Sequence, residues 1–171
     1  STTTKAGKFI NHENELKKEF NVVPISNSNG YSLFMKKKSI SNFALWGNDV
    51  LYINTFDGAT SEICYESPKN NAASAGDDVS TCHFAAGSKV VIKRNIHVKV
   101  GSITMFNLEL EDNSRIAVRQ GAKFKIEGVL KSSGTIDVGS NTSFTMADFV
   151  AASPLSKLVF HHKTRLICLS N

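Results

Sequence analysis

The sequence lacks any long apolar segment. Its longest apolar runs, such as residues 90–92 and 149–152, are far shorter than the roughly 20 residues that a transmembrane helix requires. We therefore exclude a membrane-spanning helix and expect no insertion into a membrane. The composition, 41% hydrophobic and 20% charged, is that of an ordinary globular chain, which also excludes wholesale disorder.

Cysteine is scarce as well. The three cysteines, Cys64, Cys82 and Cys168, show no Cys-x-x-Cys spacing, so the sequence predicts neither a zinc site nor a disulfide framework. Two alternatives stay open. Either Cys64 and Cys82 form one bridge, or all three are buried free thiols, which behave as small apolar side chains and fit assembly in a reducing cytoplasm.

Catalytic signatures are absent. No Gly-x-Ser-x-Gly, His-Glu-x-x-His, Walker, Gly-x-Gly-x-x-Gly or Asp-x-Asp-x-Asp motif occurs. The sequence therefore predicts no catalytic residue, no metal ligand and no cofactor. The densest carboxylates of the second half are Glu109, Glu111 and Asp112. We interpret them as solvated, with Lys131 beside Glu111 as its ion-pair partner.

The net charge of +5 is distributed unevenly. Residues 1–80 carry eight Lys and nine acidic residues, whereas residues 81–171 carry twelve Lys or Arg and six acidic residues. A basic surface favours polyanionic partners, and we expect a cell-surface glycan or another anionic polymer. Nucleic acid is disfavoured, because no aromatic residues interleave with the arginines as a stacking platform for single strands requires.

The sequence divides into three parts. Residues 1–66 predict an N-terminal helix, within residues 1–20, followed by β-hairpins. Residues 67–80 are small and polar throughout, which predicts a linker or long loop. Residues 81–171 hold a repeat, with two apolar strands after Pro154 that we expect to cap the stack or to pair with another chain.

Two hairpins are expected before the linker. The first joins residues 22–25 to residues 31–35 through a polar turn. The second joins residues 50–56 to residues 61–65 across an Asp-Gly pair, whose glycine supplies the positive φ of a tight turn.

An internal repeat fills the second half of the chain. Each unit is a turn residue, then small or polar positions, then apolar-x-apolar, and units begin at Asn113, Gly121, Ser133 and Asn141. These starts lie 8, 12 and 8 residues apart, so every second unit recurs after 20 residues. At this step similar residues fall into columns: Ile96, Ile116 and Ile136; Val98, Val118 and Val138; Phe124 and Phe144; Ile126 and Met146; Leu110, Leu130 and Val150.

The repeat predicts the fold. An apolar-x-apolar segment is typical of a strand whose alternate side chains face inwards, and a constant step means that each coil returns above the last. We therefore predict an all-β fold built on a short β-solenoid, with about 20 residues per rung and roughly three rungs between residues 93 and 150. The alternative is an antiparallel β-sandwich or jelly roll, whose hairpins also recur every 8–12 residues.

The outward-facing columns of such a solenoid are where a site is expected, because a rigid face displays side chains of successive rungs roughly 5 Å apart. Two columns carry charge: His97, Ala117 and Asp137 in one, and Lys99, Arg119 and Gly139 in the other. We predict His97, Lys99, Arg119 and Asp137 as residues that bind an anionic or hydroxyl-rich ligand. His97 and Asp137 are expected two rungs apart, too far for a direct catalytic dyad.

The ladders between residues 87 and 150, with Gly101, Gly121, Gly134 and Asn141 at turns, resemble right-handed β-helix proteins. That group includes pectate-lyase-like enzymes, autotransporter passengers and bacteriophage tailspikes or fibres. Three or four rungs are few for a polysaccharide-cleaving member. The resemblance therefore implies a structural or recognition module of a phage tailspike or fibre, or of a bacterial surface adhesin, that attaches to a host cell surface or glycan.

The same resemblance implies a homo-oligomer, a trimer, located on a virion or at the cell surface. Autotransporter passengers tend to be poor in cysteine, so the cysteines favour the phage interpretation. Two other functions stay open. One is a polysaccharide lyase or hydrolase fragment whose site another subunit completes. The other is a β-sandwich carbohydrate-binding domain in which Trp46, Tyr31, Tyr52 and Tyr65 form a sugar-stacking face, although their place in predicted strands favours core packing.

Overall fold

Every regular element in the described part of the chain is a β-strand. The computed structural model describes residues 20–35, 39–40, 44–55, 60–65 and 82–169. Within these ranges no helix is present that could cross a membrane. The helix expected within residues 1–20 lies outside the described residues, except that Phe20 begins a strand, and the linker expected at residues 67–80 lies wholly outside them.

The strands, in chain order, are β1 (Phe20–Pro24), β2 (Gly30–Met35), β3 (Ser39–Ile40), β4 (Ala44–Leu45), β5 (Val50–Thr55), β6 (Ser61–Ile63), β7 (His83–Phe84), β8 (Lys89–Ile92), β9 (His97–Val100), β10 (Ile103–Met105), β11 (Asn107–Leu110), β12 (Arg115–Val118), β13 (Lys123–Ser132), β14 (Thr135–Val138), β15 (Ser143–Ala151), β16 (Lys157–Phe160) and β17 (Arg165–Cys168).

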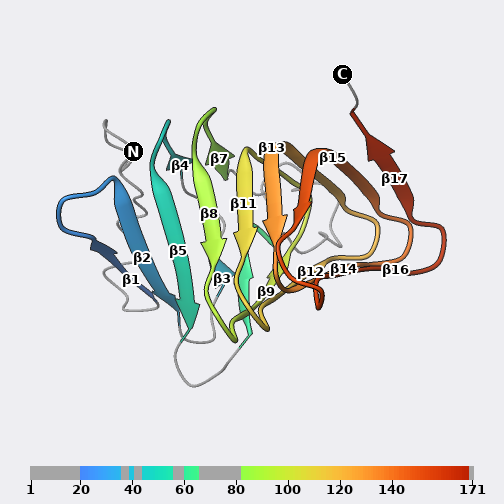
Figure 1. The fold of residues 1–171 in the computed structure, drawn as a ribbon, viewed down its shortest axis with the longest axis horizontal. Helices are drawn as coiled ribbons and strands as arrows, with labels where there is room; N and C mark the ends of the chain where they lie inside the picture. The colour runs from blue at the N-terminus through green and yellow to red at the C-terminus, as the bar shows by residue number, and fades with distance from the viewer. Residues whose placement is uncertain (1–19, 36–38, 41–43, 56–59, 66–81, 170–171) are drawn as a thin grey trace, which may run out of the picture.

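The chain winds between two main sheets. Sheet A runs in the order β1-β2-β5-β8-β11-β13-β15-β17, with β10 beside β13, and sheet B runs β16-β14-β12-β9-β6-β3. All neighbours are parallel except the antiparallel pair β1 and β2. The predicted β-solenoid is thus confirmed, with about five turns stacked side by side (Figure 1). Because a sandwich or jelly roll needs antiparallel hairpins, that alternative is excluded.

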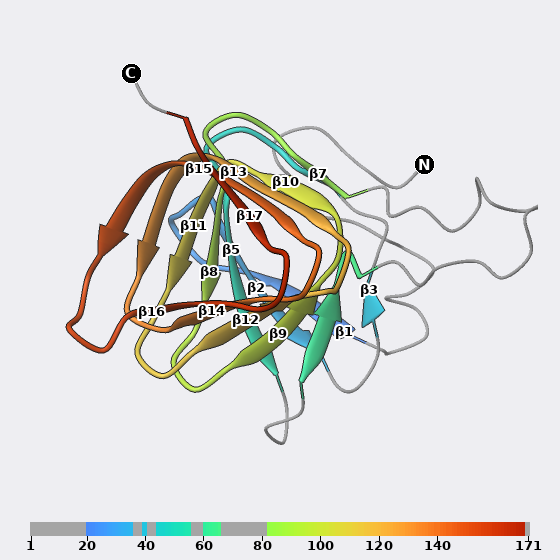
Figure 2. The same ribbon diagram turned by 90° about the vertical axis from the view of Figure 1, so that its right-hand side faces the viewer.

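The longest strands turn a corner of the solenoid. β13 pairs with β10 through its first residues and with β11 through its last ones, and its register against β15 shifts between Ile126 and Val129. Gly128 lies in this bend, where its N–H donates to the Phe106 carbonyl at 2.7 Å. A Cβ on Gly128 would come within 2.3 Å of Asn107 Oδ1. The bend gives each coil three sides, as the view along the stack shows (Figure 2).

The length of a coil varies, which corrects two expected columns. Along sheet B the paired residues are His97, Arg115, Thr135 and Lys157, in steps of 18, 20 and 22 residues. The first step is short because β9 is followed by a two-residue connection, residues 101–102, whereas β12 is followed by four residues. The columns that start at Ile96 and Val98 are therefore wrong by two residues. The inner ladders are Val98, Ile116, Ile136 and Leu158, and Val100, Val118, Val138 and Phe160.

The columns expected in sheet A give a mixed result. Phe124 pairs with Phe144 as predicted, and the two buried rings stack with centroids 5.5 Å apart. Ile126 and Met146 are also partners. The third column is wrong, because Leu130 lies between Leu108 and Phe149 and not between Leu110 and Val150. The bend in β13 and β15 takes up an unequal number of residues, which a constant step of 20 cannot represent.

Only the first expected hairpin is present. β1 and β2 pair in antiparallel fashion as predicted. The second hairpin is wrong, because β5 lies in sheet A between β2 and β8, while β6 lies in sheet B between β3 and β9. In this position Leu51 and Ile53 of β5 are buried between the coils on either side. Burial against two neighbouring coils outweighs a local turn preference.

The stack begins well before the range in which the repeat is visible in the sequence. β5 and β8 are neighbours in sheet A, and β6 and β9 are neighbours in sheet B, although residues 66–81 separate them in the chain. Cys64 and Cys82 form a disulfide between these coils, with Cα atoms 6.0 Å apart. The bridge is therefore the correct alternative, and Cys168 is free and exposed.

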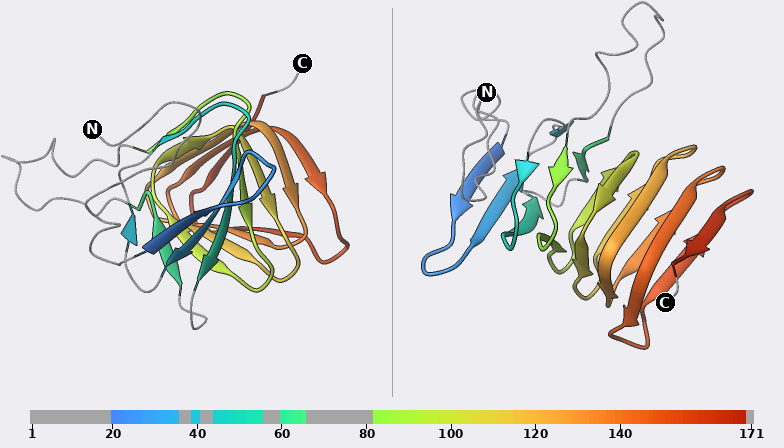
Figure 3. Two further views of the ribbon diagram at one scale, coloured as in Figure 1. Left: turned by 90° about the vertical axis from the view of Figure 1, so that its left-hand side faces the viewer. Right: turned by 90° about the horizontal axis from the view of Figure 1, so that it is seen from above.

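β16 and β17 form the last coil of the described chain. They stack in parallel on β14 and β15 and continue both sheets. Figure 3 shows β17 at one end of the row of coils. Its four residues are all exposed, whereas the matching positions of the coils beneath alternate between buried and half-buried. The two strands extend the solenoid by one coil, and their apolar side chains stay open to solvent.

Candidate functional site

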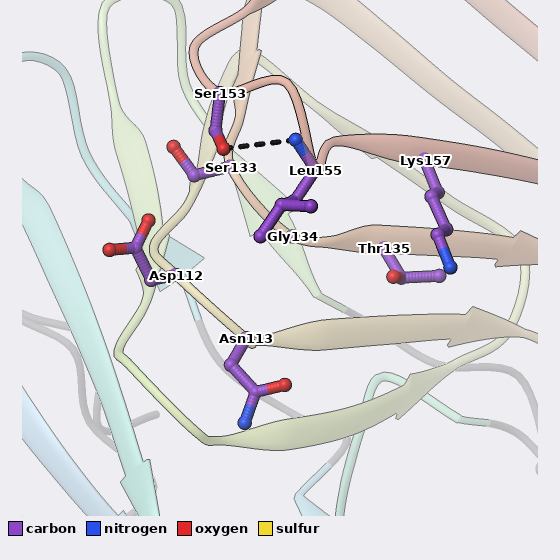
Figure 4. A pocket seen from close by; sticks show the side chains of 8 residues that line it. All are labelled: Asp112, Asn113, Ser133, Gly134, Thr135, Ser153, Leu155 and Lys157. Carbon is purple, nitrogen blue, oxygen red and sulfur yellow. Dashed lines mark hydrogen bonds between the residues drawn. The ribbon is translucent and has the colours of Figure 1, made fainter.

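A polar pocket lies where the chain passes from sheet A to sheet B in three successive coils. Its volume is about 400 Å³. The turn after β11 supplies Asp112 and Asn113, the turn after β13 supplies Ser133 and Gly134, and the connection after β15 supplies Ser153 and Leu155, with Thr135 and Lys157 at the strand starts (Figure 4).

A second pocket adjoins the first along the same corner. Its volume is about 430 Å³, and it shares Asp112 and Ser133 with the first pocket. Its remaining lining residues are Arg94, Glu109, Leu110, Glu111, Lys131 and Ala152. We call the two pockets together the corner groove. It spans coils that lie roughly 5 Å apart, so it presents a repeating set of polar groups.

The floor of the corner groove is fixed by hydrogen bonds between successive turns. Asn113, whose φ is 59°, donates from Nδ2 to Oδ1 of Asn95 in the turn of the coil beneath at 2.8 Å. Gly134 packs so closely on that turn that a Cβ would lie 2.4 Å from the Ser114 carbonyl oxygen. In the last turn the amide of Leu155 donates to Ser153 Oγ at 3.1 Å. These contacts hold the polar groups in place before any ligand binds, which lowers the entropy cost of binding.

Charge in the corner groove is arranged by ion pairs. Glu111 binds Lys93 at 3.0 Å and also accepts a hydrogen bond from the Arg94 amide at 3.0 Å. The Arg94 guanidinium lies 3.7 Å from Asp112 in an exposed pair, which contributes little to stability. Lys131 and Lys157 make no ion pair with another described residue. The predicted pair of Glu111 with Lys131 is therefore wrong, since Lys131 is in register with Glu109.

The groove offers complementary groups for a hydroxyl-rich ligand. Asp112 supplies acceptors, Lys157 supplies donors, and Ser133 and Thr135 supply both. In the view of Figure 4, Asp112 and Lys157 lie on opposite sides with Leu155 between them. Leu155 is 76% exposed, the highest value among the large apolar residues in the described chain. An apolar side chain between polar groups matches the C–H face and hydroxyl rim of a sugar.

The four residues predicted from the sequence lie elsewhere, on the outer face of sheet B. His97 is exposed and is in register with Arg115, not with Ala117 as expected. Lys99 is in register with Ala117, whose other neighbour is Asp137. The expected columns are therefore displaced by the same short coil that displaces the inner ladders. His97 and Asp137 do lie two coils apart, as predicted.

Two small clusters hold three of these four residues. The amine of Lys99 and the guanidinium of Arg119 lie 5.6 and 6.0 Å from the ring centre of Tyr65, distances typical of cation–π contacts.

Asp137 belongs to the other cluster. It pairs with Arg115, and its Oδ1 lies 2.6 Å from His161 Nε2. The structure does not gather the four residues into one site, and the role of each as a ligand-binding residue stays a prediction.

The aromatic residues considered for a sugar-stacking face are also dispersed. Tyr31 is buried, where burial and nearby Asp49 raise the pKa of its phenol. Tyr52 lies under Lys93, and Trp46 packs against His83 with ring centres 5.1 Å apart. In the part of the chain that the structure describes, no group of three His, Cys, Asp or Glu side chains could hold a metal ion.

The corner groove was missed in the sequence for an identifiable reason. Its residues occur in turn segments such as Asp112-Asn113 and Ser133-Gly134, where small and polar residues are expected for conformational reasons alone. The repeat does predict that successive turns lie above one another. What it does not give is the distance from β15 to β16, where the longer turn carries Leu155 and Lys157 to the groove.

Comparison with known proteins leaves the geometry as the only guide to function. No family model, no curated protein and no solved structure matches the chain.

Proposed function

We propose that the chain is a recognition module of a fibre or surface adhesin, and that its corner groove binds a hydroxyl-rich, acidic glycan at a cell surface. The observation that carries this proposal is the continuity of the two pockets, which share Asp112 and Ser133 and draw on three successive coils. A repeating ligand needs a repeating surface, and a solenoid supplies one at a fixed spacing.

Charge supports an acidic glycan over a neutral one. Lys131 and Lys157 stand at the groove without an ion-pair partner among the described residues, so their amines are available to a ligand carboxylate or sulfate. Asp112 and the hydroxyls of Ser133 and Thr135 are left for the sugar hydroxyls.

The disulfide supports a location outside the cytoplasm. Bonded cysteines persist in secreted proteins and at virion or cell surfaces, whereas reducing compartments keep thiols free. The bridge between Cys64 and Cys82 therefore favours the virion or extracellular location and weighs against the reduced form considered from the sequence.

Recognition is favoured over cleavage by the state of the carboxylates. Glu109 pairs with Lys89 at 2.9 Å, Glu111 pairs with Lys93, and Asp112 lies beside Arg94. A polysaccharide lyase or hydrolase instead uses carboxyl groups placed freely on either side of the scissile bond. We therefore assign these groups to holding the groove and orienting the ligand.

The test is a titration of the ¹⁵N-labelled protein with acidic oligosaccharides and with neutral ones of the same length. We expect shifts concentrated at the amides of Asp112, Ser133 and Thr135. Lys157→Ala is expected to weaken binding of the acidic ligand about tenfold, or about 1.4 kcal/mol, with no effect on the neutral one. Lys123→Ala is the matched control, since Lys123 is an exposed lysine at a strand start outside the groove. Shifts confined to Lys99 and Asp137, or none with any glycan, would contradict the proposal.

The trimer implied by the resemblance is part of this proposal. Light scattering gives the mass in solution, and SDS electrophoresis with and without heating shows whether coils of several chains interlock. We expect a trimer of about three times 18.6 kDa that dissociates in SDS only on heating. A monomer in both measurements would remove the fibre from the proposal and leave an adhesin-type binding module.

A further inference from the structure

The last coil leaves two strand edges open in the described chain. β16 ends sheet B and β17 ends sheet A. The amides of Arg165 and Leu169 donate to carbonyls of the coil beneath, at Thr142 and Met146. Since bonding alternates along a strand, the amides of Leu166 and Cys168 point towards the open side. Such an edge is a template for one more strand.

The side chains of the last coil are apolar and unburied. Phe160 is 40% exposed and Leu166 is 43% exposed, although both occupy inner columns whose other members are buried. Ile167 and Leu169 are 36% and 44% exposed. Together with the open edges, these side chains form a continuous surface, which we call the end face. It lacks the apolar neighbour that every earlier coil has.

The ion pairs of the earlier coils indicate the charge of the missing neighbour. In four pairs that bridge successive coils, the cation lies on the earlier coil and the carboxylate on the later one: Lys89 with Glu109, Lys93 with Glu111, Arg94 with Asp112, and Arg115 with Asp137. The remaining such pair, His161 with Asp137, runs the other way. The usual partner of a basic coil is therefore an acidic strand on its C-terminal side.

The end face carries the basic half of this arrangement without the acidic half. Residues 149–169 contain Lys157, His161, His162, Lys163 and Arg165, and no Asp or Glu. Lys163 and Arg165 are exposed and form no ion pair with a described residue. Like charges oppose each other when two copies of this end meet, and the edge strand β1 of another copy has no acidic residue within Phe20–Pro24.

From these observations we propose that the end face binds an extended, acidic segment of a partner protein by strand addition. Main-chain hydrogen bonds from Leu166 and Cys168 pair the segment with β17, its alternate apolar side chains cover Phe160 and Leu166, and its carboxylates meet Lys163 and Arg165. The partner's strand takes the place of the next coil.

The test uses two fluorescent octapeptides, alternating Glu-Val and alternating Lys-Val, with the intact protein. We expect the Glu-Val peptide to bind with at least about tenfold higher affinity by anisotropy and to weaken with salt. We expect it to slow amide exchange at Leu166 and Cys168. The double variant Lys163→Glu and Arg165→Glu is expected to reverse the preference, whereas Lys123→Glu, outside the end face, leaves it unchanged.

A second variant separates the backbone from the charges. Leu166→Pro removes an N–H that points to the open side and leaves the bonds to β15 in place, so it is expected to abolish binding while circular dichroism stays that of the native protein. Equal binding of both peptides, or no binding, overturns the proposal. So does a concentration-dependent dimer, seen by sedimentation, that Leu166→Pro disrupts, because the end face is then covered by a second copy.

Discussion

The inner column Phe124, Phe144 and Leu166 passes through two interior coils and ends in the last one. The two phenylalanines are fully buried and stack on each other, whereas Leu166 is 43% exposed. All three residues occupy the same register position, in strands of the same sheet. The difference in burial thus arises from what lies on the other side of the coil.

This comparison shows where stability resides in a stacked fold. Each coil is stabilised by its neighbours on both sides, so an interior coil gains from two interfaces and a terminal coil from one. The same rule explains why β14 buries Ile136 and Val138 completely while Leu158 and Phe160, one coil later, are partly exposed. The sequence pattern is the same in both, and only position distinguishes them.

The largest expected effect is at the interior end of that column. Phe124→Ala removes a ring with coils on both sides and should lower the free energy of unfolding by about 3–5 kcal/mol. Leu166→Ala, at the matching position of the last coil, should cost about 1 kcal/mol or less, since much of that side chain is already in water. Urea denaturation measures both. Equal losses would mean that the end face is buried in solution.

An intermediate effect is expected at the corner of β13. Gly128→Ala places a Cβ against the Phe106 carbonyl and Asn107 Oδ1, so the unfolding free energy should fall by about 1–3 kcal/mol. Gly121→Ala is the control, because nothing lies within 4 Å and the cost, about 1 kcal/mol, comes only from its φ of 78°. Thermal melts of both variants, compared with Leu166→Ala, rank the corner between the interior and the last coil. A larger loss for Gly121→Ala would contradict the packing argument.

The part of the fold that repeats with a constant step was predictable from the sequence. Phe124 over Phe144 and Ile126 over Met146 follow from the 20-residue period, because the connections on both coils have equal length there. The columns through Ile96 and Val98 failed because one connection is two residues shorter. Periodicity reads the average coil and is insensitive to one that departs from it.

The first coils were hidden for a different reason. The step from Gly30 to Val50 is again 20 residues, but the next, from Val50 to Lys89, is 39, because residues 66–81 interrupt the coil. An insertion of this size removes the alignment on which a repeat search depends. The corner groove was hidden as well, since turn residues such as Asn113 and Ser133 have conformational reasons to be there.

The smallest expected effect concerns the ion pairs that connect the last coil to the interior. Asp137 in β14 contacts Arg115 in β12 and His161 just after β16, and both partners are about half exposed. Asp137→Asn should therefore lower the global unfolding free energy by only about 0.5–1 kcal/mol, as expected for partly exposed pairs.

The local consequence of Asp137→Asn should be easier to detect than the global one. Amide exchange in β16 and β17 is expected to speed up, because His161 loses its contact with the coil beneath, while exchange in β9 and β12 stays near the native rate. Ala117→Ser, a change of similar size in β12 on the same outer face, serves as the control. Uniform acceleration across all coils would show that the last coil unfolds together with the interior, and would remove the distinction drawn between them.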